Sequence, residues 1–172
     1  MKAFLDDHQI VSAWVPIDIC APGGVATTSD YVCLKNWEKC LIVLFKAAGT
    51  AGDDPTITLD QATAVAGTDT KTLACITKSW IKTGAALNAI GAFTAAAQTA
   101  AATLVGSATS AEEQSIMCVE VSADDLDVSN GFDCLRATVA DPGAAGTQYA
   151  CGLYILSGPR YAAGVAPSAI VD

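Results

Sequence analysis

The sequence is poor in the residues that most enzymes use for catalysis. Histidine occurs once in 172 residues, as His8, so a Ser-His-Asp or Cys-His arrangement would depend on one residue near the amino terminus. Neither a P-loop nor a dinucleotide-binding glycine fingerprint is present. A common zinc site is not indicated, because a second histidine and closely spaced cysteine pairs are both missing. We therefore expect no catalytic residues, no cofactor and no metal, and we predict that the protein is not an enzyme.

Charged residues are also scarce, at 16% of the chain, compared with about 25% in an ordinary globular domain. Nine basic and 18 acidic residues give a formal net charge of −9. This acidic balance argues against a nucleic-acid partner, because phosphate backbones are repelled. Hydrophobic residues reach 52%, and the mean hydropathy is +0.40. A small soluble domain cannot hide so much apolar surface by itself, so we expect part of it to be buried against other protein chains.

No segment has the pattern of a signal peptide or of a membrane-spanning helix. Residues 1–8 contain one early lysine, but acidic residues interrupt them where the apolar core of a signal peptide should begin. Residues 83–111 are uncharged, yet they consist mostly of Ala, Thr and Gly and include Asn88 and Gln98. Their transfer into a bilayer is only weakly favourable. We expect no membrane partner.

The chain contains seven cysteines, and none of them forms a C-x-x-C pair. Their number is odd, so they cannot all pair within one chain. Since no secretory signal is present, we interpret them as buried apolar residues in a reducing compartment. Disulfides formed after cell lysis are the alternative. The cysteines are Cys20, Cys33, Cys40, Cys75, Cys118, Cys134 and Cys151.

Short apolar runs between turn-forming residues predict an all-β fold. Residues 39–46 contain six consecutive apolar residues and are followed by Gly, Asp and Pro, a pattern typical of a strand buried on both faces. Together with strands at 31–36 and 56–62, this segment is expected to form a meander that starts the sandwich. Further strands are predicted at 10–15, 70–82, 115–121, 132–140 and 148–156. The spacing indicates a single-domain antiparallel β-sandwich or a jelly-roll-like barrel.

The two ends of the chain differ in composition from the predicted body at residues 30–156. Residues 1–29 are expected to form an N-terminal arm, and residues 157–172 a C-terminal tail that lies on the surface. Residues 88–105 are rich in Ala, which favours a helix, but they have no apolar stripe at helical spacing, so we favour extended or irregular structure. Ser110–Glu113 matches a capping box that could begin a single helical turn.

The acidic segment 124–131 invites comparison with a calcium-binding loop. Counted from Asp125, however, Asn130 stands where the loop needs glycine, and Arg136 stands where it needs glutamate. We therefore favour a solvated acidic turn, with a weak irregular calcium site as the alternative.

Six residues are candidates for contact with a partner. The three tryptophans could form a platform for a sugar, although scattered tryptophans more often anchor a core or an interface. An arginine and a tyrosine just past the last strand could hold the tail to a partner, or could pack locally. The candidate interface residues are Phe4, Trp14, Trp37, Trp80, Arg160 and Tyr161.

Four segments resemble a family of small virion structural proteins of tailed bacteriophages and prophages. They are residues 30–45 (DYVCLKNWEKCLIVLF), 48–67 (AGTAGDDPTITLDQATAVAG), 122–139 (SADDLDVSNGFDCLRATV) and 153–161 (LYILSGPRY). The resemblance implies a virion component, made in the host cytoplasm and placed on the capsid surface. Its most specific form is a capsid decoration or cement protein, although this chain has more cysteines than the family pattern.

The resemblance also implies partners, namely the major capsid protein and further copies of this chain. A homotrimer at the local three-fold positions of the shell is the natural geometry. A protein that binds the assembled shell and not its free subunits would stabilise the shell. The alternative is a head-fibre or tail component that binds host surface glycan through the tryptophans.

Overall fold

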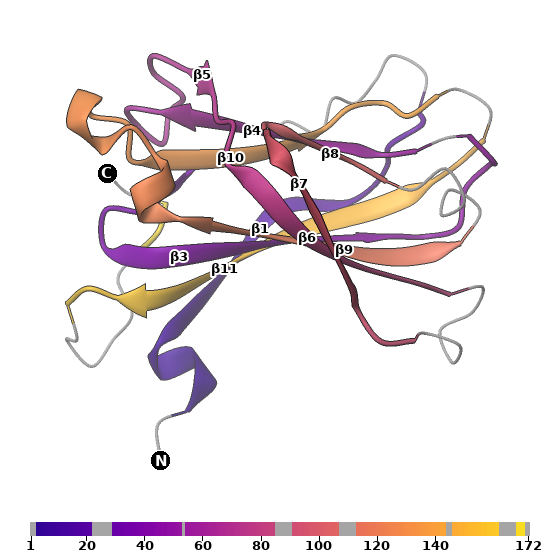
Figure 1. The fold of residues 1–172 in the computed structure, drawn as a ribbon, viewed down its shortest axis with the longest axis horizontal. Coiled ribbons are helices and arrows are strands. Elements are labelled where there is room, and N and C mark those ends of the chain that lie inside the picture. Colours follow the sequence, from indigo (N-terminus) through magenta and orange to yellow (C-terminus); the bar gives the residue numbers. More distant parts are fainter. Residues whose placement is uncertain are drawn as a thin grey trace.

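Two antiparallel β-sheets packed face to face form the body of the protein (Figure 1). The computed structural model describes residues 3–21, 29–52, 54–84, 91–106, 113–143, 146–161 and 168–170. Within these ranges, helical structure is limited to three short 3-10 turns: η1 (Phe4–Asp6), η3 (Ala123–Asp125) and η4 (Val128–Asn130). The predicted all-β sandwich is confirmed.

The larger sheet has six strands, and one long strand in its middle pairs along its length with a neighbour on each side. In spatial order the strands are β1 (His8–Asp18), β11 (Tyr149–Pro159), β3 (Trp37–Lys46), β9 (Gln114–Ser122), β6 (Ile76–Gly84) and β7 (Thr94–Ala101). β3 pairs with β11 from Trp37↔Pro159 to Lys46↔Ala150, and with β9 on its other side. The predicted strand of six apolar residues therefore lies in the middle of the larger sheet.

The smaller sheet is built from short strands and covers one face of the larger sheet. Its strand order is β2 (Val32–Cys33), β10 (Cys134–Val139), β4 (Thr56–Ala62) and β5 (Lys71–Thr72), and β8 (Thr103–Val105) also pairs with β4. In Figure 1 these strands form the upper layer, and the six-stranded sheet lies below them.

The expected meander is wrong, because its three strands alternate between the two sheets. β2 and β4 belong to the smaller sheet, whereas β3 between them belongs to the larger one. The chain crosses from β2 to β3 in a tight turn, in which the Trp37 N–H donates to the Leu34 carbonyl at 3.0 Å. After β3, residues 47–55 lead back across the roughly 10 Å that separates packed sheets. The hydrogen-bonding partners of β3 therefore come from distant parts of the sequence.

Much of the segment expected to be an N-terminal arm is an edge strand of the larger sheet. β1 pairs with β11 from His8↔Ser157 to Asp18↔Tyr149. The ring of Trp14 lies against Gly152, where a Cβ would come within 2.5 Å of it. Pro16 does not prevent pairing, because it lies in an irregular stretch of an edge strand, where a missing N–H is tolerated.

The expected C-terminal tail also joins the body where it is described. β11 continues to Pro159, and the Arg160 N–H donates to the Asn36 carbonyl at 2.9 Å. Farther on, Ala169 is fully buried, and its carbonyl accepts a hydrogen bond of 2.7 Å from the Cys33 N–H. The described part of the tail therefore lies beside β2.

The long strand predicted at 70–82 is divided between the two sheets. Its beginning is β5 in the smaller sheet and its end belongs to β6 in the larger sheet, with a crossing at Leu73–Cys75. Leu73 is buried in this crossing, and its N–H donates to the Leu59 carbonyl at 2.9 Å. The preference for extended structure at 88–105 is confirmed by β7 and β8 in the described part of this range, 91–105, whereas 88–90 lie outside the described residues. The predicted capping turn begins at Ser110, which is outside the described residues.

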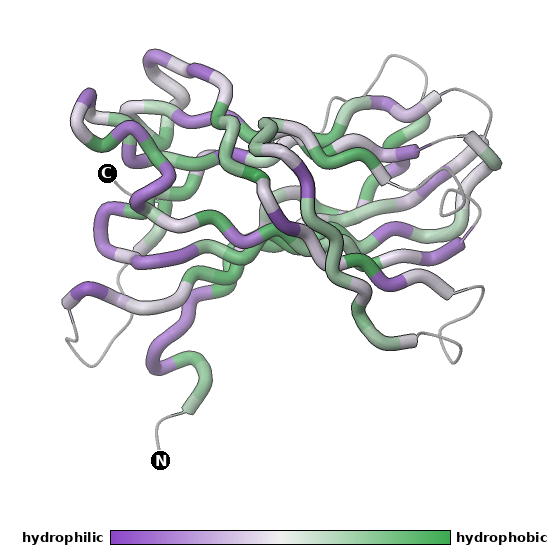
Figure 2. The backbone as a smooth tube through the Cα atoms, in the orientation of Figure 1, coloured by the Kyte–Doolittle hydropathy of each residue, from purple (hydrophilic) through white to green (hydrophobic). Residues whose placement is uncertain are grey.

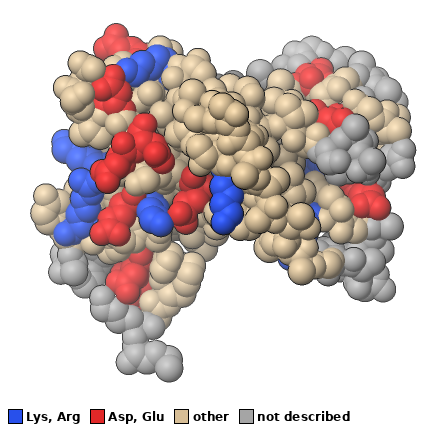
Figure 3. Space-filling model, in the orientation of Figure 1, with Lys and Arg blue, Asp and Glu red and all other residues tan. Residues whose placement is uncertain are grey.

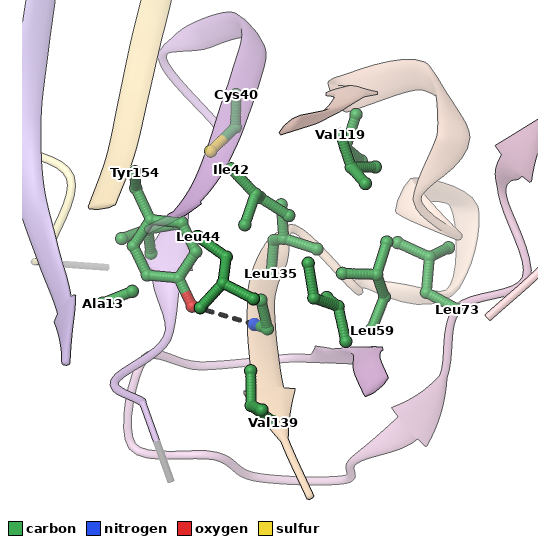
Figure 4. Close-up of a cluster of buried hydrophobic side chains, with 14 of the residues drawn as sticks. Ala13, Cys40, Ile42, Leu44, Leu59, Leu73, Val119, Leu135, Val139 and Tyr154 are labelled. Carbon is green, nitrogen blue, oxygen red and sulfur yellow. Dashed lines mark hydrogen bonds between the residues drawn. The ribbon is translucent and has the colours of Figure 1, made fainter. Parts of the chain in front are cut away.

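The core fills the space between the sheets. Alternate side chains of β3, namely Cys40, Ile42 and Leu44, are fully buried and point toward Leu59 and Leu135 of the smaller sheet (Figure 4). The alternation of buried and outward side chains along β3 is the pattern expected of packed sheets. In Figure 2, hydrophobic residues occupy the middle of the strands and hydrophilic residues gather at one end.

Tyr154 joins the two sheets by hydrogen bonds as well as by packing. Its side chain is fully buried, and its Oη accepts a hydrogen bond of 2.8 Å from the Ala137 N–H of β10 (Figure 4). Ser29 Oγ lies 2.8 Å from the same Oη and donates to the Ala137 carbonyl. β2 pairs only with Cys134 and Leu135 of β10, so it does not reach Ala137. The two hydroxyls supply hydrogen-bonding partners for the Ala137 N–H and carbonyl instead. Burial raises the pKa of Tyr154, so the phenol stays protonated.

Candidate functional site: the outer face of the six-stranded sheet

The face of the larger sheet that points away from the core is apolar and largely uncovered by the described chain. On β3, Leu41 and Val43 are half-buried, and Phe45 is 37% exposed. Leu153 of β11 is 38% exposed and Ile10 of β1 is 48% exposed. Ten residues together form what we call the outer apolar face: Ile10, Leu41, Val43, Phe45, Trp80, Ile116, Cys118, Cys151, Leu153 and Ile155.

The strand register brings these side chains together in rows across the sheet. Val43 of β3 lies opposite Leu153 on one side and Cys118 on the other, and Cys118 lies opposite Trp80 of β6. Directly opposed residues in antiparallel strands share a face and are in contact. Since neighbouring strands are about 4.8 Å apart, a row across all six strands extends over roughly 24 Å.

Charged groups stand at the border of this face and not at its centre. Lys39 and Glu120 form an ion pair of 2.9 Å, and the hydrogen bond that the ammonium donates to this carboxylate raises the pKa of Lys39. On β6, the Lys78 Nζ lies 5.0 Å from the Trp80 ring centroid, and the Lys82 Nζ lies 4.6 Å from that of Phe93. Figure 3 shows charged side chains gathered toward one end of the molecule. An apolar centre with a polar rim is the usual anatomy of a protein interface.

The outer apolar face ends in a shallow pocket of about 310 Å³. Tyr149, which is 58% exposed, stands at its edge. Such a pocket can receive a single large side chain from a partner, as interface pockets often do. The lining residues are Pro16, Phe45, Ala47, Gln114, Tyr149, Ala150 and Cys151.

Two of the three tryptophans proposed as contact residues belong to the core. Trp37 is 0% exposed and Trp14 is 7% exposed, so neither presents a ring to a sugar or to a partner. Trp80 is half-buried and lies on the outer apolar face. The favoured interpretation as core anchors holds for Trp14 and Trp37, and the alternative of a platform of three tryptophans is excluded, because a single ring lies on this face.

Phe4, Arg160 and Tyr161 lie near one end of the larger sheet, because His8 pairs with Ser157. Phe4 is 57% exposed and stacks on the His8 ring at 3.9 Å, while Tyr161 is 70% exposed. Both can reach a partner. The Arg160 guanidinium lies 3.9 Å from the Asp124 carboxylate, so this residue packs locally.

The acidic segment at 122–131 uses its carboxylates within the fold. Asp127 accepts hydrogen bonds from Lys71 Nζ, from Ser129 Oγ at 3.0 Å and from Asn130 Nδ2 at 2.8 Å. The hydrogen bond from Lys71 is the main cause that lowers the pKa of Asp127 to about 2. Asp125 accepts the Ser122 N–H at 2.8 Å and caps η3. These contacts agree with the favoured prediction of an acidic turn and add that its carboxylates are hydrogen-bonded within the fold.

Apart from Trp80, the residues of the outer apolar face were missed in the sequence analysis, although a signal for them was present. The run of apolar residues in β3 was taken to mean burial on both faces. The structure buries one face inside the sandwich and leaves the other half-open. The same two-sided apolar pattern recurs in β11 at residues 149–156. Two adjacent strands with this pattern could have indicated an assembly surface.

Comparisons with known proteins provide no family assignment. No protein-family model matches the chain, and no curated protein matches it. Among solved structures, the chain is similar to the N-terminal CBM22-1–GH10 modules of Clostridium thermocellum endo-1,4-beta-D-xylanase 10B complexed with xylohexaose. The identity is 8% and the TM-score 0.22, over 91% of this chain and 27% of that one. This chain therefore matches about a quarter of that structure, at a level that carries no argument about fold or function.

No helix in the described residues combines the length and the apolar character needed to cross a bilayer.

Proposed function

We propose that this protein is a non-enzymatic structural subunit that docks its outer apolar face onto other protein chains. One observation carries the proposal: β3 is apolar on both faces, but the described chain covers only one of them. Strands with continuous apolar runs are normally buried on both faces. The largest apolar patch on a protein surface, typically about 300–600 Å², is often the functional one.

The outer apolar face is small for a protein interface, so we expect it to act where many copies bind one assembly. A width of roughly 24 Å and a length of roughly 14 Å along β3 give a footprint of roughly 300–400 Å². A standard interface buries about 800 Å² on each partner. The face alone would therefore bind weakly. Phe4, Tyr161 and the pocket beside Tyr149 can enlarge it, and simultaneous attachment of several copies would strengthen the whole through avidity.

The most specific form of this proposal is a decoration or cement protein on the capsid of a tailed bacteriophage. The resemblance of four sequence segments to virion structural proteins supports it, as does an apolar docking face. In this role the partners are the major capsid protein and further copies of the chain as a trimer. Binding that requires the assembled shell would shift the assembly equilibrium toward that shell.

Glycan binding by a head fibre or tail component has less support from the geometry. Trp37 and Trp14 are buried, and Trp80 is the only one of the three tryptophans with its ring on the outer apolar face.

The proposal is tested by locating the protein on purified virions and by changing the centre of the face. Leu153→Glu places a charge there, and Val128→Glu is a matched control in η4, where the side chain is 56% exposed. We expect the wild type and the control to co-sediment with shells in many copies per particle, and the Leu153→Glu variant to remain in the supernatant while folded. Equal binding by all three proteins would refute docking through this face. A few copies at one vertex would refute the decoration role.

A further inference from the structure

A second site lies in the smaller sheet, where two cysteines from distant parts of the chain are directly opposed. Cys33 of β2 pairs with Cys134 of β10. The Leu34 N–H donates to the Asp133 carbonyl at 2.8 Å. This inter-strand hydrogen bond joins the residues that flank the two cysteines, so Cys33 and Cys134 form a non-hydrogen-bonded pair. In such a non-hydrogen-bonded pair the Cα atoms are about 4.5 Å apart and the side chains are at their closest. The sheet register therefore brings the two thiols together.

A carboxylate completes a group of three ligand atoms. The Sγ atoms of Cys33 and Cys134 and a carboxylate oxygen of Asp133 all lie within 4.8 Å of one another. The Cys134 Sγ is 3.3 Å from the Asp133 Oδ1. Zn–S bonds of about 2.3 Å and Zn–O bonds of about 2.0–2.2 Å at tetrahedral angles place neighbouring ligand atoms roughly 3.5–3.8 Å apart. Small side-chain adjustments would therefore place all three atoms around one ion.

The surroundings of the group fit a partly enclosed metal site. Cys33 is 3% exposed and Cys134 is 0% exposed, and they pack with Tyr31 and Ala62 in a small apolar cluster. Asp133 is half-buried, which leaves a route from solvent and a fourth position for water. On the same face the Arg136 guanidinium lies 4.6 Å from the Tyr31 ring and pairs with Asp60 at 3.0 Å. The neighbouring Cys33 thiol, burial and Asp133 all raise the pKa of the Cys134 thiol, so a metal ion has to displace that proton when it binds.

We propose that Cys33, Asp133 and Cys134 bind a thiophilic divalent cation, of which Zn²⁺ fits the donor set best. Two thiolates, one carboxylate and one water form a four-coordinate shell suited to a d¹⁰ ion, and harder cations such as Mg²⁺ and Ca²⁺ prefer oxygen ligands alone. Each thiol loses its proton to solvent when the ion binds, so binding releases about two protons. The ion would fasten β2, a strand of two residues, to β10 and to the segment that precedes it.

The proposal predicts one Zn²⁺ per chain and a higher melting temperature. The full chain is kept reduced, and Zn²⁺ is titrated in competition with a chromophoric chelator, while Cd²⁺ reports thiolate ligation by its charge-transfer absorption. At a hundredfold excess of free Zn²⁺ over its dissociation constant, the melting temperature should rise by roughly 5–10 °C. The Cys33→Ser and Cys134→Ser variants should lose the Cd²⁺ band and the thermal shift. Cys75→Ser, a half-buried cysteine outside the group, should keep both.

Asp133→Asn keeps the proposal testable if either serine variant fails to fold. It removes a half-buried carboxylate and leaves both thiols, so affinity should fall at least about tenfold while circular dichroism stays unchanged. Zn²⁺ binding that is equal in wild type and Asp133→Asn would overturn the role of the carboxylate. The whole proposal is overturned if the wild type binds no Zn²⁺, or if a Cys33–Cys134 disulfide persists under the reducing conditions of the assay.

Discussion

Two adjacent residues of β3 allow stability and docking to be perturbed separately. Ile42 is 0% exposed and points into the core, whereas Val43 is half-buried on the outer apolar face. Replacing each with threonine introduces the same β-branched side chain on opposite faces of one strand. We expect Ile42→Thr to lower stability with little direct effect on docking, and Val43→Thr to weaken docking with little effect on stability.

The two magnitudes follow from burial. Ile42→Thr loses apolar contacts worth about 1.5–2 kcal/mol and buries a hydroxyl at a cost of about 1–3 kcal/mol, which together make roughly 3–5 kcal/mol. For a chain of this length, the melting temperature should fall by roughly 6–20 °C. Val43→Thr keeps shape and strand preference, so stability should change by less than about 1 kcal/mol. If a partner covers Val43, the buried hydroxyl costs about 1–3 kcal/mol, or roughly 5–150-fold in affinity.

Thermal unfolding by circular dichroism measures the first effect, and co-sedimentation with assembled shells measures the second. The wild-type chain provides the reference in both assays. Equal loss of stability in the two variants would mean that Val43 is as enclosed as Ile42 and that the outer face is not open. Unchanged docking by Val43→Thr, in a protein that does bind shells, would show that binding uses another surface.

Three further predictions concern the body of the fold. Tyr154→Phe leaves the Ala137 N–H without its partner in the core, so the free energy of unfolding should fall by roughly 1–3 kcal/mol in chemical denaturation. The pKa of Asp127 is lowered to about 2. The ionised carboxylate therefore contributes to stability above its unfolded pKa near 4, and this contribution is lost as the pH falls toward 2. Lys71→Met should raise the pKa of Asp127 in an NMR titration. Deleting residues 1–7 should leave the melting temperature nearly unchanged. Deleting residues 1–20 removes β1 and the buried Trp14 ring, and it should prevent stable folding. Equal stability of the two truncated proteins would contradict the place of β1 in the sheet.

The strands could be predicted from sequence, but their partners could not. The apolar runs in β3, β9, β10 and β11 identify strands because alternation and turn residues are local signals. Whether two successive strands pair or cross to the opposite sheet depends on how the connection bends. The tight turn at Leu34–Trp37 carries the chain between layers, and no residue in it distinguishes this path from a hairpin. The meander was predicted for that reason, and it was wrong.

The candidate site was only partly visible in sequence, because burial depends on the whole fold. Trp37 and Trp80 are chemically identical, and only the sheet register shows that the first points into the core and the second outward. A strand was predicted at 10–15 within the arm and was ended at Pro16, but β1 continues to Asp18, because an edge strand tolerates a proline. Cys33 and Cys134 are far apart in the chain, so their pairing follows from the register of β2 and β10 alone.

Alkylation of Cys151 tests most directly whether a partner covers the outer apolar face. Cys151 is half-buried on this face, and Cys75 is half-buried at the crossing between β5 and β6, so one protein carries both a probe and an internal reference. The rates of maleimide labelling at the two cysteines are compared by mass spectrometry in the isolated chain and in the assembled particle. We predict that assembly slows labelling of Cys151 at least about tenfold relative to Cys75. An unchanged ratio would contradict the account, because the face would then be as open in the particle as in the free protein.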